Sequence, residues 1–148
     1  MRAAIQRVLE ASVDVDGTRL SHIDRGLLVF LGVTTTDGPA QADWMVDKIL
    51  ALRVFGDDAG RFDASVVDVG GGVLVVSQFT LYADTRKGRR PSFTAAAPPD
   101  QAEPLYQRVV DGVAARGLAT GAVRFGAHML VRLVNDGPVT ILLDSTAT

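Results

Sequence analysis

Residues 26–33, Gly26-Leu27-Leu28-Val29-Phe30-Leu31-Gly32-Val33, form an apolar run of strand length that starts at one glycine and closes near another. An uninterrupted run of this kind indicates a strand that is covered on both faces. We therefore expect it in the centre of a β-sheet. Upstream, Val13-Asp14-Val15-Asp16-Gly17 alternates apolar and acidic residues and ends in Asp-Gly. This pattern predicts a strand and a tight hairpin turn, with the returning strand over residues 19–23.

Two amphipathic segments predict the main helices of the protein. The first follows the helix-start residues Thr36-Asp37-Gly38-Pro39, and the second opens with Pro98-Pro99-Asp100 and is stopped by Gly117. Both segments carry apolar side chains at the three-four spacing of one helical face. The expected stripes are Ala42, Met45, Val46, Ile49, Leu50 and Arg53 in the first helix, and Ala102, Leu105, Tyr106, Val109, Val110 and Val113 in the second.

The remaining apolar runs predict strands. A short one covers residues 54–55, a long one follows Gly70-Gly71-Gly72 over residues 73–81, and two more cover residues 125–134 and 139–143. No linker or repeat divides the chain. The order of elements predicts a single α+β domain over residues 1–148, with largely antiparallel β-sheets and two main helices.

Composition excludes several kinds of chemistry. The 148 residues contain no cysteine, which rules out a thiolate nucleophile and cysteine-bound zinc. His22 and His128 are the only histidines and show no paired ligand spacing, so we expect no metal. No apolar run approaches the roughly 20 residues that span a bilayer, and we expect a cytoplasmic protein. The triple glycine precedes a strand and lacks a following Gly-Lys-Ser/Thr, so it predicts a turn, not a phosphate-binding loop.

The segment Ser77-Gln78-Phe79-Thr80-Leu81 is the first candidate site, because polar residues here end an otherwise apolar strand. A regular strand would send Ser77 and Thr80 to opposite faces, so both can serve one pocket only if the strand bends or ends near Phe79. Main-chain amides freed there could hold a carbonyl or an oxyanion. Alternatively, both hydroxyls simply form hydrogen bonds within a sheet. A Ser77-His128-Asp triad is a further alternative, which the short supply of bases disfavours.

Two other segments carry candidate residues. Asn135-Asp136-Gly137-Pro138 predicts a hairpin between the last two strands; with a cis proline, its carbonyls could form a rigid acceptor pair that selects one enantiomer. Between Tyr82 and Phe93 the chain has four cations, Arg86, Lys87, Arg89 and Arg90, against the single acid Asp84. This local excess on a chain of net charge -2 indicates either a phosphate-binding patch or a solvated loop of paired charges.

Together, Ser77-Gln78-Phe79-Thr80-Leu81 and Asn135-Asp136-Gly137-Pro138-Val139-Thr140 resemble the two signature motifs of the D-aminoacyl-tRNA deacylases, formerly called D-Tyr-tRNA deacylases. The resemblance extends through Ile5-Gln6-Arg7-Val8, Gly26-Leu27-Leu28-Val29 and Arg90-Pro91-Ser92-Phe93 to the closing Leu143-Asp144-Ser145. One motif alone is suggestive, whereas both in this order and spacing are specific. His128 is a departure, since the family commonly has an acidic residue there.

The resemblance implies hydrolysis of D-aminoacyl-tRNA by a homodimer that needs no cofactor. It implies catalytic roles for Ser77, Phe79 and Thr80, and substrate binding by Gln78 and by a cis Gly137-Pro138 that enters the partner's site and rejects L-amino acids. Glycyl-tRNA would also be accepted. Water would be activated with help from a ribose hydroxyl of the tRNA, with Thr80 as a covalent nucleophile ranked second. Arg86, Lys87, Arg89 and Arg90 would then contact tRNA phosphates. A non-catalytic RNA-binding module and a serine esterase remain the competing functions.

Overall fold

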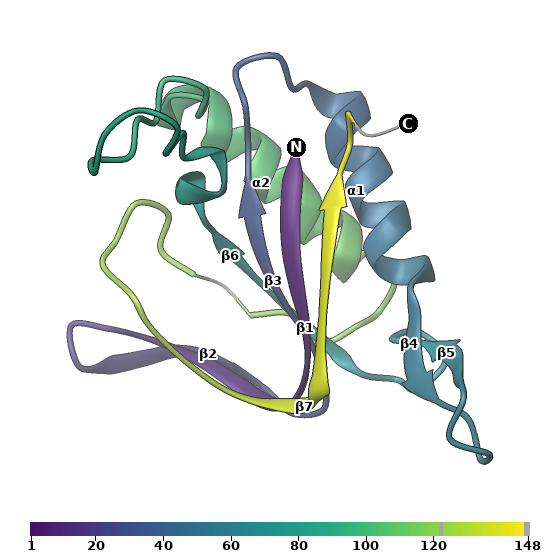
Figure 1. Ribbon diagram of the computed structural model, residues 1–148. Coiled ribbons are helices and arrows are strands. Elements are labelled where there is room, and N and C mark those ends of the chain that lie inside the picture. Colours follow the sequence, from purple (N-terminus) through teal and green to yellow (C-terminus); the bar gives the residue numbers. More distant parts are fainter. Residues whose placement is uncertain (122, 147–148) are drawn as a thin grey trace.

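The computed structural model describes residues 1–121 and 123–146 and is built around a mixed β-sheet (Figure 1). Strand β1 (Arg2–Val15) organises the sheet because it has partners along both edges. One edge pairs with β3 (Gly26–Gly32) and then with β2 (Thr18–Ile23), and the other edge pairs with β7 (Leu130–Asp144), all antiparallel. The sheet is therefore largely antiparallel, as predicted.

Strand β6 (Gly72–Ser77) adds the parallel pairing that the sequence pattern did not specify. It lies beside β3, with Gly26 opposite Gly72 and Leu31 opposite Ser77. The chain approach at the first pair is close, because a Cβ on Gly26 would lie 1.9 Å from the carbonyl oxygen of Gly72. The glycines around residue 70 therefore serve a turn and a close strand contact. The predicted turn is confirmed.

Both predicted helices are present and cover one face of the sheet. They are α1 (Pro39–Ala51) and α2 (Pro99–Ala114), which lie behind the sheet in Figure 1. Their predicted stripes are buried against β1, β3 and β6, with Val110 partly buried. Arg53 is an exception, since α1 ends before it and Arg53 is exposed in the small sheet of β4 (Arg53–Gly56) and β5 (Phe62–Ser65).

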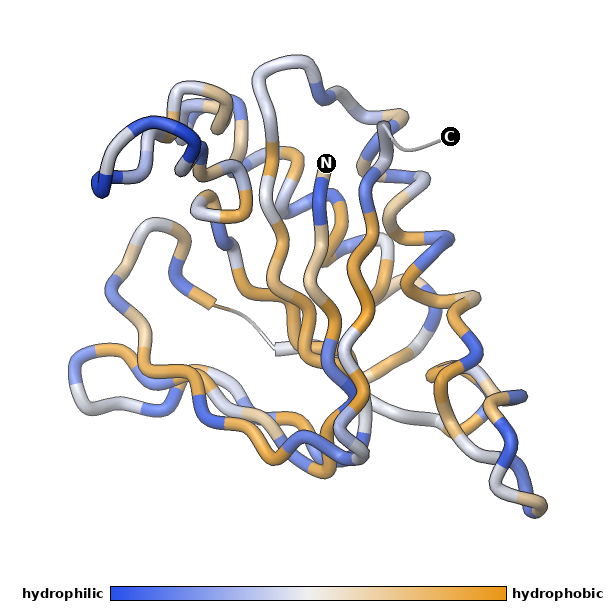
Figure 2. Tube along the Cα trace, in the orientation of Figure 1, coloured by the Kyte–Doolittle hydropathy of each residue, from blue (hydrophilic) through white to orange (hydrophobic). Residues whose placement is uncertain are grey.

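The second face of β3 and β6 is covered by the sheet itself. Register irregularities accompany a bend in β1, and the end of β1 with β2 and the start of β7 form an arm (lower left in Figure 1). Side chains of this arm pack with Leu28, Leu74 and Val76 in a second apolar cluster. The prediction that residues 26–33 are covered on both faces is confirmed. In the tube of Figure 2, the hydrophobic colour concentrates on these central strands.

Two predicted elements need correction at the C-terminal end. The last two strands form one strand, β7, which passes through residues 135–138 without reversing. Both halves pair with β1, so Asn135 to Thr140 spans only Val8 to Gln6 on the partner strand. The predicted hairpin is therefore wrong: the segment is a bulge. The strand also starts at Leu130 instead of Phe125, because residues 125–127 form a turn and residues 128–129 are not paired in a strand.

No helix among residues 1–121 and 123–146 is long and apolar enough to cross a membrane.

Candidate functional site

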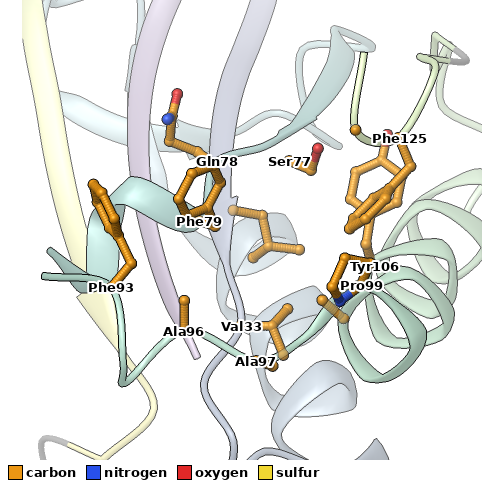
Figure 3. A pocket seen from close by; sticks show the side chains of 13 residues that line it. Val33, Ser77, Gln78, Phe79, Phe93, Ala96, Ala97, Pro99, Tyr106 and Phe125 are labelled. Carbon is orange, nitrogen blue, oxygen red and sulfur yellow. The ribbon is translucent and has the colours of Figure 1, made fainter. Parts of the chain in front are cut away.

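A largely apolar cavity of about 370 Å³ opens where β3 and β6 end. Its walls come from the ends of both strands, residues 93–97, the start of α2 and the turn at Phe125 and Gly126. Figure 3 shows two aromatic pairs at opposite ends of this cavity. Phe79 and Phe93 have ring centroids 5.0 Å apart, and Tyr106 and Phe125 have centroids 5.8 Å apart. The cavity is thus a slot between aromatic walls, suited to a flat or apolar group.

Ser77 is the last residue of β6 and lines this cavity, and it lies between the two aromatic pairs in Figure 3. The strand stops two residues before Phe79, and a short 3₁₀ helix, η1 (Phe79–Tyr82), follows. The expectation that the strand ends near Phe79 is confirmed. A hydrogen bond of 2.7 Å from the amide of Gln78 to the carbonyl of Leu31 fixes the start of this turn.

The first amides of η1 are free donors. A helix leaves its first N–H groups without intrahelical acceptors. Among residues 1–121 and 123–146, the amides of Phe79 and Thr80 donate to no other group, whereas Leu81 donates to the Gln78 carbonyl at 3.2 Å. Two adjacent main-chain donors thus follow directly after the end of β6, the first of them on Phe79, which lines the cavity. Such a pair can hold a carbonyl oxygen or a developing oxyanion.

The side chains of Gln78 and Thr80 form a hydrogen bond with each other. The amide of Gln78 donates to Oγ1 of Thr80, and Thr80 does not line the cavity. This bond holds the Thr80 hydroxyl as an acceptor at the outside of the turn. No side chain that could take its proton is bonded to it in the described part of the chain.

The two histidines lie away from a triad geometry. His22 is on β2, where its Nε2 lies 3.8 Å from Glu10 and 3.9 Å from Asp24, and it lines a different pocket from Ser77. His128 is absent from the cavity lining and forms no ion pair with a carboxylate of the described residues. The structure therefore gives no support to a Ser77-His128-Asp triad.

Tyr106, which lines the cavity, and Arg7, which contacts residues 135–138, are two residues whose roles sequence reasoning did not single out. Burial raises the pKa of the Tyr106 phenol, which donates to the carbonyl of Val75 in β6 at 2.8 Å. It braces the strand that ends at Ser77. Arg7 lies on the same inward face of β1 as Ala3 and Ile5, because alternate residues of a strand share a face. A charged residue at such a position indicates a buried partner.

That partner is the bulge of β7. Arg7 is 13% exposed; its Nε donates to the carbonyl of Asp136 at 2.9 Å, and its Nη1 donates to the carbonyl of Val54 at 2.6 Å. Reciprocal side-chain and main-chain bonds between Asn135 and Val139 close the base of the bulge at 3.3 and 2.9 Å. The Gly137–Pro138 peptide bond is cis, which is the isomer that the resemblance implies.

Within one chain, the bulge and the cavity are separate. No described residue of β7 lines the cavity, which is at the opposite end of the strands from Arg7: Ser77 is level with Leu31 and Ala3 across the sheet. A single chain therefore brings Ser77, Gln78 and Phe79 together but does not bring Gly137 and Pro138 to them.

The basic segment forms a closed loop beside the cavity. The backbones of Asp84 and Ser92 exchange hydrogen bonds of 2.8 and 2.9 Å. Arg86 pairs with Asp84 through two hydrogen bonds of 2.9 and 2.6 Å, and this guanidinium holds the pKa of Asp84 well below its usual range. In the described part of the chain, Lys87, Arg89 and Arg90 have no carboxylate partner. The interpretation as a loop of paired charges thus holds for Arg86, whereas the other three cations have no carboxylate partner among the described residues and stay candidates for phosphate contacts. The loop is a strongly hydrophilic tip in Figure 2.

The fold and the cavity define a class: a small α+β protein with free main-chain donors at the rim of an apolar slot, suited to binding an acyl group by its carbonyl. Among the described residues no cluster of potential metal ligands accompanies it.

Comparison with known proteins gives the family. The model of the D-Tyr-tRNA(Tyr) deacylase family matches residues 4–144, and the chain belongs to this family. A relative from Roseiflexus castenholzii, named D-aminoacyl-tRNA deacylase, is 59% identical over 98% of this chain and 92% of its own length.

Two solved structures share the fold. One, titled c-Myc DNA Unwinding Element Binding Protein, superposes with a TM-score of 0.91 at 43% identity over 99% of this chain and 100% of that chain. The other, described as a probable eukaryotic D-amino acid tRNA deacylase, gives a TM-score of 0.82 at 18% identity over 96% of this chain and 97% of that chain. The resemblance inferred from the two motifs is confirmed at the level of family and fold.

Proposed function

We infer that this protein hydrolyses the ester bond between a D-amino acid and the terminal adenosine of tRNA, releasing both as free products. Membership of the deacylase family over nearly the whole chain supports the reaction. The structural observation that carries the inference is the pair of free amides at Phe79, which lines the apolar slot, and at the adjacent Thr80. Ester hydrolysis passes through a tetrahedral oxyanion, which such donors stabilise.

The chain supplies orientation more than acid–base chemistry. In this proposal the ester carbonyl accepts hydrogen bonds from the amides of Phe79 and Thr80, and Ser77 contacts the substrate from the end of β6. Gln78 fixes the Thr80 hydroxyl, which therefore makes a poor covalent nucleophile. A ribose hydroxyl of the terminal adenosine assists the attacking water. No metal or organic cofactor takes part.

The chirality filter is contributed by a second copy of the chain. Gly137 and Pro138 project from a bulge that is distant from the chain's own cavity, so a homodimer is needed to bring them to Ser77 of the partner. Arg7 and the Asn135–Val139 bonds hold the bulge in place. Its carbonyls would exclude an L side chain sterically, whereas D-aminoacyl groups and glycine would enter.

Binding of tRNA rests on the closed basic loop. Lys87, Arg89 and Arg90 would contact phosphates without reading the base sequence, and Arg86 would contribute less because Asp84 already neutralises it. We place the protein in the cytoplasm, where charged tRNA is used, and treat residues 1–148 as one domain.

The direct test compares deacylation of D-Tyr-tRNA and L-Tyr-tRNA by the purified protein, with and without a chelator. The proposal predicts much faster release of D-tyrosine and no effect of the chelator. Equal rates on the two enantiomers would overturn it. Binding of tRNA without loss of the ester would instead indicate an RNA-binding module, and activity that His128→Ala abolishes would indicate a serine esterase.

A further inference from the structure

Two exposed aromatic side chains stand at one end of the cavity. Phe79 is 56% exposed and Phe93 is 36% exposed, although both are large apolar residues. Their rings meet edge to face with an interplanar angle of 70°. In Figure 3 they lie at the end of the slot opposite Tyr106 and Phe125. An exposed apolar pair at the mouth of a binding cavity marks a surface for a ligand or partner.

The backbone around Phe93 is fixed on both sides. The bridge between Asp84 and Ser92 ends at the preceding residue, and the amide of Ala96 donates to the Phe93 carbonyl at 3.0 Å. Beyond this turn, the amide of Ala97 donates to the Val33 carbonyl at 2.9 Å. An aromatic ring on such a rigid support offers contact area at a small cost in conformational entropy.

Unpaired positive charge lies close to Phe93 in the chain. Lys87, Arg89 and Arg90 belong to the loop that closes at Ser92, one residue before Phe93. Aromatic side chains beside a basic track are the combination that binds single-stranded nucleic acid, with bases stacked on the rings and phosphates near the cations.

We propose that Phe93, supported edge-on by Phe79, stacks the nucleobase that precedes the terminal adenosine of the aminoacylated strand. This inference rests on the proposed deacylase function. The ester held by the amides of Phe79 and Thr80 fixes the terminal nucleotide at the slot. Successive nucleotides of a stacked strand advance roughly 3.4 Å, so the preceding base is near enough to the terminal nucleotide to reach the rim where Phe93 is exposed. Its phosphate then points towards the basic loop.

The test combines variants of Phe93 with variants of the substrate. D-Tyr-tRNA is prepared with its normal penultimate nucleotide and with an abasic residue at that position. We expect Phe93→Ala to lower kcat/KM on the normal substrate about tenfold, the range measured for loss of one base–aromatic stack. Phe93→Trp should retain the wild-type value. On the abasic substrate, wild type and Phe93→Ala should be equal, because the same interaction is then missing from both.

Val67→Ala is the matched control, since Val67 is another exposed apolar residue and lies outside the cavity lining. Equal losses for Phe93→Ala on both substrates would overturn the inference and make Phe93 a wall of the slot. A change in oligomeric state on size exclusion would overturn it in favour of a contact with a second copy. A wild-type protein that does not hydrolyse D-Tyr-tRNA rejects the proposed function itself, whereas an active wild type with Phe93-independent kinetics rejects only the stacking role.

Discussion

The rim at residues 77–82 and the bulge at residues 135–139 are both interruptions of a strand, but they present opposite chemistry. At the rim, β6 ends at Ser77 and the following 3₁₀ turn leaves amide donors free. At the bulge, β7 continues on both sides, and Arg7 and Asn135 hold the main chain in place. The rim belongs to its own cavity, whereas the bulge projects away from it.

Because of this difference, we expect the rim to determine the rate of ester hydrolysis and the bulge to determine the choice between D- and L-aminoacyl groups. Donors at a strand end need no other chain, so the rim can stabilise an oxyanion in each subunit. In the proposed function, the carbonyls of the bulge act on a substrate only when a second copy of the chain brings the substrate to them. Damage to the rim should therefore slow ester hydrolysis, and damage to the bulge should first weaken the choice between D and L.

The largest effect is expected from removing a rim donor. Phe79→Pro deletes one amide, and proline is tolerated at the first position of a helical turn. We expect kcat on D-Tyr-tRNA to fall by about 10²- to 10³-fold, as for other losses of one oxyanion donor. Phe79→Leu is the control, because it removes the ring but keeps the amide. An equal loss in both variants, measured by single-turnover deacylation, would assign the effect to the ring.

A smaller effect should follow from a Cβ in the bulge. Gly137 has φ 149°, and an added Cβ would lie 2.7 Å from the amide nitrogen of Val139. Gly137→Ala must therefore shift the loop, and we expect the D/L ratio of kcat/KM to fall about 10²-fold, the scale for a misplacement of about 1 Å. Hydrolysis of D-Tyr-tRNA should change much less. A preserved ratio would show that the bulge does not face the substrate.

Weakening the hydrogen bonds that Arg7 donates to the bulge should reduce selectivity less than Gly137→Ala does. Arg7→Lys keeps the charge but replaces the two donor nitrogens that reach the carbonyls of Asp136 and Val54 by a single ammonium nitrogen. We expect the D/L ratio to fall about tenfold and the free energy of unfolding to drop by about 2 kcal/mol, the scale for hydrogen bonds to a charged donor. Urea denaturation and paired kinetics measure the two effects. A loss of stability with an unchanged ratio would limit Arg7 to a structural role.

The basic loop should affect affinity and its salt dependence. Replacing Lys87, Arg89 and Arg90 by Gln removes three candidate phosphate contacts, and the slope of log K against log salt should become shallower by about 2. Arg86→Gln should change the slope less, because Asp84 already pairs with Arg86. Titrations of uncharged tRNA at several salt concentrations measure both slopes. If Arg86→Gln changed the slope as much as each of the other three replacements does on average, the weaker role given to Arg86 would be contradicted.

The smallest effect is expected at the Thr80 hydroxyl. Thr80→Ala removes a hydroxyl that already accepts a hydrogen bond from the Gln78 side chain, and Thr80 does not line the cavity. The rate on D-Tyr-tRNA should change little, whereas a substrate that lacks the free ribose hydroxyl on its terminal adenosine should react slowly. The reverse pattern, with full loss for Thr80→Ala and none for the altered substrate, would make Thr80 the nucleophile.

The sequence predicted the rim better than the bulge for a physical reason. Alternation along a strand is a local property, so the placement of Ser77 and Thr80 on opposite faces already indicated that the strand bends or ends near Phe79 if both serve one pocket. Asn135-Asp136-Gly137-Pro138 has the residues of a reversing turn, and only the pairing of both flanks with β1 shows that the chain continues. Local composition does not contain that long-range information.

Other site features depend on contacts that composition cannot show. The sequence shows the excess of positive charge between Tyr82 and Phe93 but not how it is paired. In the structure Asp84 neutralises Arg86, which leaves the other three cations available. Phe93 was seen only as part of a motif, because its pairing with Phe79 depends on the turn that follows β6. The inward position of Arg7 on its strand indicates a buried partner, but only the structure identifies that partner as the bulge.

The central claim, that rim and bulge of one site come from two chains, is tested most directly by mixing two variants. Gly137→Ala protein hydrolyses L-Tyr-tRNA in this account because its rim is intact and its partner's bulge is displaced. An excess of Phe79→Pro protein is inactive but carries an intact bulge. After subunit exchange, the account predicts that the excess suppresses L-Tyr-tRNA hydrolysis while D-Tyr-tRNA hydrolysis persists. L-Tyr-tRNA hydrolysis that is unchanged by the excess, in mixtures shown by native mass spectrometry to contain mixed dimers, would contradict the claim.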